Sequence, residues 1–170
     1  MTDRPVTELD PVRRLRVLAA GLNAVMYADA HLDLPFADVW AVASDLEVEL
    51  PYLLPMLRAF RTSPGAPGAS ARSSAWAYGP FGHRARFDIV LRPGWCLMQS
   101  GCVVRGMAAV PESAGTRFAV LGGLRRSWTT PAQRALRPLG KVRGRRMIAR
   151  AEHRTVLRYP PDRRPMEPTG

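Results

Sequence analysis

Residues 84–99 read RARFDIVLRPGWCLMQ, and this stretch decides the fold. Apolar and charged side chains alternate over Arg84–Arg92, which is the two-residue period of a strand with one buried face. Pro93 and Gly94 are turn residues, and Trp95–Gln99 is a second short strand after them. The stretch therefore predicts an antiparallel hairpin. The apolar face of its first strand carries Ala85, Phe87, Ile89 and Leu91.

Further strand patterns lie on both sides of this hairpin. Met56–Thr62 and Arg72–Tyr78 precede it and are separated by a loop rich in Pro and Gly. Cys102–Val110 and Thr116–Leu124 follow it and are joined by a turn over residues 111–115. Short strands joined by tight turns pair with their neighbours in sequence, so these segments predict an antiparallel meander.

One more strand precedes the meander. Apolar and polar residues alternate over Met26–Leu34, which predicts a half-buried strand that ends before Pro35. The next segment, Phe36–Leu54, has apolar residues at helical spacing and predicts one or two short helices. Residues 1–24 form an N-terminal arm in this interpretation, with a short helix after the N-cap candidate Asp10.

The last element is a long basic helix. Thr130 is a suitable N-cap, and the proline after it suits the first helical position. The helix is expected to run to about Arg154, with a disturbance near Pro138. Residues 25–158 are therefore predicted to form one domain, and the Pro- and Gly-rich residues 159–170 a disordered tail.

The segment AHLDLPFADVW at Ala30–Trp40, together with this order of elements, resembles the START-like (SRPBCC) superfamily. Members include polyketide cyclases, plant pathogenesis-related proteins and lipid-transfer domains. The resemblance implies an α+β helix-grip fold, in which a curved antiparallel sheet of about seven strands wraps around the C-terminal helix, with two short helices after the first strand. It also implies a pocket for an apolar ligand between the sheet and the last helix.

The ligand-lining candidates are residues expected to face that pocket. On the strand Arg72–Tyr78, either the two aromatic residues or the alanines next to them face inward, and the alternation leaves both open. A filled core and a partly open cavity both fit this sequence. The predicted lining residues are Trp76, Tyr78, Phe87, Ile89, Leu91, Trp95, Leu97, Val104, Phe118, Val120, Leu136 and Met147.

Two residues are candidates for proton transfer, and neither comes from a recognised catalytic motif. His83 shares its parity with Phe87, so it can lie at the mouth of the pocket, where an imidazole acts as an acid or a base. The alternative for His83 is a turn residue that faces water beside Gly82. Tyr78 is the second candidate. No set of residues matches a characterised cyclase, so the resemblance assigns no catalytic residue.

The orientation of Arg105 has two interpretations. Arg105 lies between Val103 and Met107 on one face of its strand. If that face is inward, a buried guanidinium needs an anionic partner, either a ligand carboxylate or a protein acid. If it is outward, Arg105 is solvated. The other face, with Val104 and Ala108, is also apolar, and this favours the outward orientation.

The chain is strongly basic, with 25 Lys and Arg against 14 Asp and Glu and a net charge of +11. Arg143, Arg146 and Arg150 gather at helical spacing on the terminal helix. One interpretation is a solvated outer face, and the other is contact with an anionic membrane surface. Nucleic acid is disfavoured, because this helix has no aromatic residues for base stacking.

Cys96 and Cys102 form no metal-ligand pattern, so no metal is predicted, and both are expected to be buried free thiols. No cofactor is predicted either. A cytoplasmic location is expected, because no segment approaches the roughly 20 apolar residues of a membrane span.

The sequence supports three function hypotheses, of which the first is favoured. It is non-enzymatic binding or transport of a small hydrophobic molecule, such as a lipid, a polyketide or an isoprenoid-like compound, in the internal cavity. The second is a polyketide cyclase- or dehydratase-like enzyme that uses the same cavity. The third is interaction with a membrane or nucleic acid through the basic helix.

Overall fold

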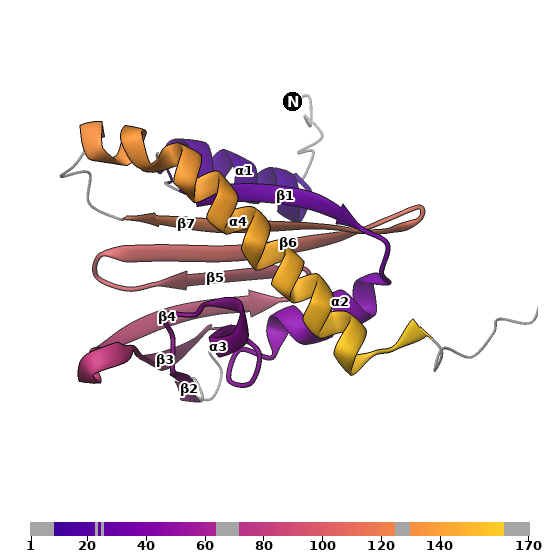
Figure 1. Ribbon diagram of the computed structural model, residues 1–170, viewed down its shortest axis with the longest axis horizontal. Coiled ribbons are helices and arrows are strands. Elements are labelled where there is room, and N and C mark those ends of the chain that lie inside the picture. Colours follow the sequence, from indigo (N-terminus) through magenta and orange to yellow (C-terminus); the bar gives the residue numbers. More distant parts are fainter. Residues whose placement is uncertain (1–8, 23, 25, 64–71, 125–129, 162–170) are drawn as a thin grey trace, which may run out of the picture.

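The computed structural model describes residues 9–22, 24, 26–63, 72–124 and 130–161, apart from the side chains of Arg72 and of residues 130–137. It is an α+β fold, in which one curved, open, antiparallel sheet carries helices on both faces (Figure 1). The strands are β1 (Met26–Leu32), β2 (Ala59–Ser63), β3 (Arg72–Tyr78), β4 (Arg84–Arg92), β5 (Trp95–Gln99), β6 (Val103–Glu112) and β7 (Gly115–Leu124). The helices are α1 (Pro11–Gly21), α2 (Phe36–Ser44), α3 (Leu50–Leu53) and α4 (Thr130–Arg158), and Pro80–Gly82 forms a short 3-10 turn.

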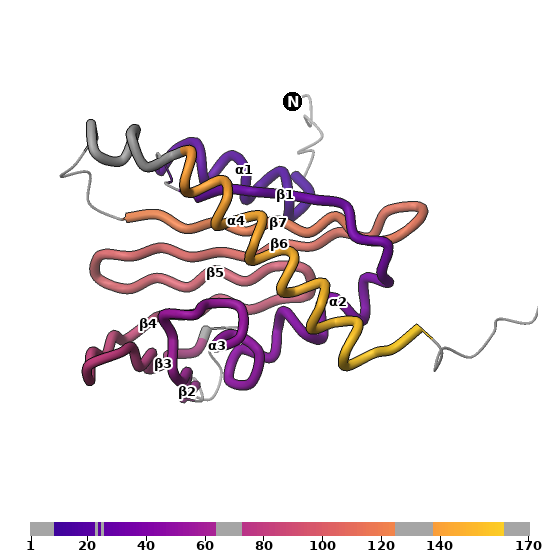
Figure 2. Tube along the Cα trace, viewed as in Figure 1, coloured from indigo at the N-terminus to yellow at the C-terminus, as the bar shows by residue number. Residues whose placement is uncertain are grey.

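The seven strands pair in the order β1-β7-β6-β5-β4-β3-β2. Strands β2 to β7 therefore form the predicted meander, and β1 joins its far edge by pairing with β7 (Figure 2). Strands β6 and β7 are longer than expected, because pairing continues to Glu112 opposite Gly115. Gly115 has a φ of 149°, a conformation that favours glycine and permits the short connection between the two strands.

Helix α4 crosses the inner face of the sheet diagonally and packs mainly on β1 and α2 (Figure 1). Its small and apolar residues face the sheet, since Gly140, Gly144, Met147 and Ala151 are all buried. A Cβ atom on Gly144 would lie 2.8 Å from the Cβ of Ala28. Only glycine therefore lets the helix approach β1 this closely.

Helix α1 covers the outer face of the sheet over β6 and β7. The Asp10 carboxylate accepts a hydrogen bond of 2.9 Å from the Arg13 amide, and Pro11 is the first helical residue, as predicted. Leu15 is fully buried above Gly106, where a Cβ would lie 2.7 Å from the Leu15 Cδ1. The sheet is consequently buried on both faces beneath these two helices.

Candidate functional site

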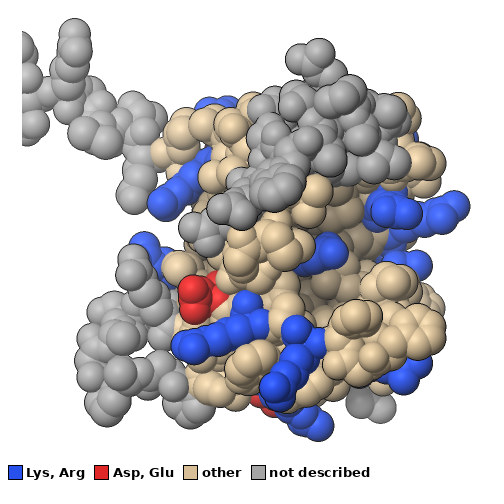
Figure 3. Space-filling view, turned by 90° about the vertical axis from the view of Figure 1, so that its left-hand side faces the viewer, with Lys and Arg blue, Asp and Glu red and all other residues tan. Residues whose placement is uncertain are grey.

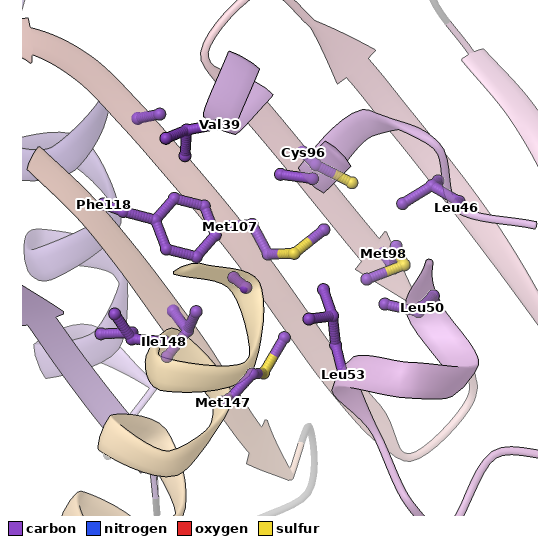
Figure 4. Close-up of a cluster of buried hydrophobic side chains, with 14 of the residues drawn as sticks. Val39, Leu46, Leu50, Leu53, Cys96, Met98, Met107, Phe118, Met147 and Ile148 are labelled. Atoms are coloured by element: carbon purple, nitrogen blue, oxygen red, sulfur yellow. The ribbon is translucent and has the colours of Figure 1, made fainter. Parts of the chain in front are cut away.

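The middle of the space between the sheet and α4 is filled by side chains (Figure 4). Leu53 of α3, Met107 and Phe118 of the sheet, and Met147 of α4 point toward one another there. All four are at most 5% exposed. The interior is closed at this level, so the centre of the interface is the filled core that the sequence left open as one of two alternatives.

The inward orientation predicted for part of the lining set is confirmed. Phe87, Ile89, Phe118, Val120 and Met147 are buried in this core, and Leu91 packs against it. Since they contact each other in a closed core, their role in ligand binding stays a prediction. Leu136 lies in α4, but its side chain is outside the described part of the structure.

Trp95, Leu97 and Val104 face the other way, and their predicted inward orientation is wrong. All three pack in the second cluster, on the outer face beneath α1. Their sequence neighbours Cys96 and Met98 face α4 instead. Because α1 buries the outer face as well, β5 and β6 carry apolar residues on both faces. Their sequences therefore lack the alternation of apolar and polar residues that would identify the inner face.

Trp76 and Tyr78 also point away from α4. They are 37% and 40% exposed, whereas Ala75 and Ala77 are buried in the inner core. Phe60 of the neighbouring strand is fully buried in that same core. Because its ring fills the space, the inner face of β3 has room only for small side chains such as alanine. The Arg84 guanidinium lies 5.4 Å from the Trp76 ring centroid on the exposed side.

The two candidates for proton transfer do not meet in a pocket. His83 is exposed at the turn that joins β3 to β4, next to Phe81, which has a φ of 62° and is 92% exposed. Tyr78 is exposed on the outer face. Neither lines the pocket described next.

A pocket of about 300 Å³ lies beneath the N-terminal half of α4, beside the closed core. The ends of β1, β6 and β7 form its floor, where Gly122 and Gly123 contribute no side chains. The side of the molecule that carries these strand ends is hollowed, and Lys and Arg side chains lie in and around the hollow (Figure 3). The other described lining residues are Met26, Val103, Arg105, Leu124, Leu139, Gly140 and Arg143.

Arg105 faces this pocket, so the outward orientation favoured from the sequence is wrong. It shares the inner face of β6 with Val103 and Met107, and both of these contact the inner core. Across the sheet it lies between Met98 of β5 and Gly122 of β7. The Arg105 Nη1 lies 3.7 Å from the point where a Gly122 Cβ would lie, and the Met26 Cε lies 2.9 Å from the same point.

The Arg105 guanidinium has no acidic partner among the residues that the structure describes. It is partly buried, and desolvation by burial lowers its pKa from the ordinary value. An arginine nevertheless stays charged at physiological pH, since its ordinary pKa exceeds about 12. A positive charge therefore faces a mostly apolar pocket.

Arg143 is the second cation of the pocket and reaches it from α4. The described lining residues include no Asp or Glu that would compensate the two charges. His and Cys are absent from the same set, which leaves it without a side chain suited to proton transfer near neutral pH.

The comparisons with known proteins identify the fold. No protein-family model matches the chain, and no curated protein does. The protein TTHA0849 from Thermus thermophilus is similar, with a TM-score of 0.57 and 17% identity over 79% of this chain and 98% of that one. Ara h 8.0201 has a TM-score of 0.54 and 11% identity, over 78% and 97% of the two chains. The chain therefore has the helix-grip fold.

The di-domain ARO/CYC protein StfQ of the steffimycin biosynthetic pathway shares the helix-grip fold too, with a TM-score of 0.59 and 12% identity. The match covers 78% of this chain and 50% of StfQ. At these identities the similarity establishes the fold. The pocket between the sheet and α4 lies where the resemblance in sequence implied one, although it occupies only one end of the helix-grip interface.

The opposite end of the helix-grip interface is held by charge pairs. Glu49 is 1% exposed, and its carboxylate accepts hydrogen bonds of 2.7 and 3.0 Å from Arg154 of α4. Arg158 donates a hydrogen bond of 2.8 Å to Asp45, and the Arg154 guanidinium lies 4.0 Å from the Tyr52 ring centroid. These arginines have partners within the protein.

The arginines of α4 that were candidates for membrane contact differ in exposure. Arg143 and Arg146 are exposed, as an outer solvated face requires. Arg150 is partly buried and donates a hydrogen bond of 3.3 Å to the Leu53 carbonyl. Contact of these three residues with an anionic membrane stays a prediction.

Among the described residues there is no group of three or more potential metal ligands, and no helix long and apolar enough to cross a membrane. Cys96 is buried in the inner core, and burial raises its pKa to about 12, which keeps the thiol protonated and unreactive. Cys102 is exposed, so the prediction that both thiols are buried is wrong for this residue. It lies in the connection between β5 and β6, where the sheet has ended.

Proposed function

We propose that this protein binds a small hydrophobic molecule in the pocket beneath the N-terminal half of α4. The observation that carries the proposal is the pocket itself, with the apolar side chains of Met26, Val103, Leu124 and Leu139 around a glycine floor. Largely apolar concavities with few polar groups are the usual form of small-molecule sites. The helix-grip fold is consistent with a site at this interface.

The size of the pocket limits the ligand. A volume of about 300 Å³ is at the lower end of the range for small-molecule sites, about 300 to 1,000 Å³. Larger lipid, polyketide or isoprenoid-like molecules would extend through the opening toward solvent. The described lining has no proton-transferring side chain, which favours binding or transport over the cyclase- or dehydratase-like alternative.

Titration with decanoate and decanol, below their critical micelle concentrations, tests this proposal. Isothermal calorimetry should show saturable binding of at least one probe to the wild-type protein. Val103→Phe places a larger side chain in the pocket and should weaken that binding about tenfold or more, because the ligand and the ring compete for the same volume.

Val17→Phe is the matched control, because Val17 is 61% exposed on α1, on the other face of the sheet. This variant should bind like the wild type. Absence of binding of both probes, together with no co-purified small molecule in native mass spectrometry, would overturn the proposed function. Unchanged binding in Val103→Phe would place the ligand elsewhere and overturn the proposed site.

A further inference from the structure

We infer that the molecule held in this pocket carries an anionic group, a carboxylate or a phosphate, which Arg105 binds from the sheet and Arg143 from α4. The inference rests on the proposed function and specifies its ligand class. It follows from the position of Arg105, from the absence of an acidic partner in the described structure, and from the second cation at the same pocket.

The position of Arg105 is exceptional within its row of the sheet. Ile89, Met98, Arg105, Gly122 and Met26 lie side by side on the inner face of five adjacent strands. The other four members of the row are apolar or glycine. An arginine in such a row loses hydration and gains nothing from its neighbours, unless an anion from outside the protein completes the site.

The contrast with Arg154 strengthens this argument. Arg105 lies between the sheet and α4, whereas Arg154 of α4 forms two hydrogen bonds with the buried carboxylate of Glu49, which directly precedes α3. The fold thus supplies a carboxylate to one interfacial arginine, whereas the described residues supply none to the other. A ligand oxyanion at Arg105 would occupy the same chemical role as Glu49.

The lining also indicates how such a ligand would lie. The anionic group would contact the Arg105 guanidinium where it lines the pocket. The apolar part would lie against Met26, Val103 and Leu139. Arg143 is exposed at the opening, so its attraction is screened by salt, while that of the partly buried Arg105 is screened less.

Affinities for three probes with the same alkyl chain test the inference: decanoate, decyl phosphate and the uncharged decanol. The wild type should bind at least one anion roughly ten to a hundred times more tightly than decanol, the range expected for charge-assisted hydrogen bonds. The anion that binds more tightly identifies the head group. Arg105→Met should lose this preference and retain decanol binding, because methionine keeps the apolar wall.

Arg86→Met is the matched control, since Arg86 is exposed on the outer face of β4. It should keep the preference for the anion. Arg105→Lys keeps the charge without the forked donor geometry and should show an intermediate preference, which provides a reading if the methionine variant folds poorly.

Equal binding of decanol and both anions by the wild type, or an unchanged preference in Arg105→Met, would overturn the inference and leave the proposed function standing. Failure of all three probes to bind would overturn the proposed function, and the inference with it.

Discussion

The two ends of the interface between the sheet and α4 are packed differently. From the middle of α4 toward its C-terminal end, methionine, leucine and phenylalanine side chains close the gap, and Arg154 is neutralised by Glu49. At the N-terminal end, glycines leave a pocket of about 300 Å³, and Arg105 faces it without a described acidic partner. The closed end stabilises the fold, which allows the open end to keep a charge and a void at a cost in stability.

The largest effect is expected from Phe118→Ala at the closed end. Phe118 is fully buried in the inner core, so its truncation leaves a cavity and should lower the free energy of unfolding by about 3 to 5 kcal/mol. Urea denaturation monitored by tryptophan fluorescence measures this change. Leu139→Ala at the pocket should cost less than about 1 kcal/mol, because Leu139 is 55% exposed. Equal losses in both variants would contradict the distinction between the two ends.

The next effect concerns the charge pair. Glu49→Gln should lower the free energy of unfolding by about 2 to 4 kcal/mol, because it leaves Arg154 without its buried counter-charge. Glu152→Gln, at an exposed position of α4, should change stability by less than about 0.5 kcal/mol. Chemical denaturation of the two variants under identical conditions measures the difference. A Glu49→Gln variant as stable as the control would show that the pair contributes nothing.

The change in the free energy of unfolding caused by Arg105→Met should have the opposite sign. Without ligand, it removes a desolvated guanidinium and adds an apolar side chain beside Met98, so the free energy of unfolding should rise by about 1 kcal/mol. Arg86→Met on the exposed face should be close to neutral. A thermal shift assay on ligand-free protein distinguishes them. Clear destabilisation by Arg105→Met would mean that this guanidinium has a stabilising partner, and the two ends would then be alike.

The smallest effect is a pH dependence from a group outside both ends. Hydrogen bonds with Glu112 and Asp33 raise the pKa of His31, and hydrogen bonds with Arg117 and His31 lower the pKa of Glu112. The His31 contribution is present below its ordinary pKa of about 6.5 and disappears as the pH rises through the raised value. The Glu112 contribution is present above its ordinary pKa of about 4.3 and disappears as the pH falls through the lowered value.

The stability difference between the wild type and His31→Gln should therefore be largest near pH 5 to 6, between the two ordinary values, and should vanish in alkaline solution. Melting temperatures over this pH range measure it. A difference that grows toward high pH would contradict the assigned protonation. The same pH series on Arg105→Met should run parallel to the wild type, because the described lining residues include no Asp, Glu, His or Cys.

Much of the fold could be predicted from the sequence, because its signals are local. The alternation in Arg84–Arg92 and the turn at Pro93 and Gly94 determine one hairpin, and similar patterns predict the other strands. The inward orientation of Phe87 and Phe118 was predictable for the same reason. Asp10 and Pro11 likewise indicated where α1 begins.

The candidate site could be predicted only in its general place. The sequence places Trp95, Leu97 and Val104 on the inner face because large apolar residues usually lie in a core, but α1 provides a second core on the other face. The same ambiguity concealed Arg105, although its parity with Val103 and Met107 was a usable signal. Its position opposite Gly122 depends on the strand register, which no local pattern of side chains determines.

The absent side chain of Gly144 has a further consequence for the whole molecule. A Cβ at this position would lie only 2.8 Å from that of Ala28, so the missing side chain sets the distance between helix and strand. Gly140 lies one helical turn away and lines the pocket, so the height of the chamber is set by how closely the next turn rests on β1. Any bulkier residue at position 144 would act as a wedge, tilting the helix and resizing the chamber from outside it.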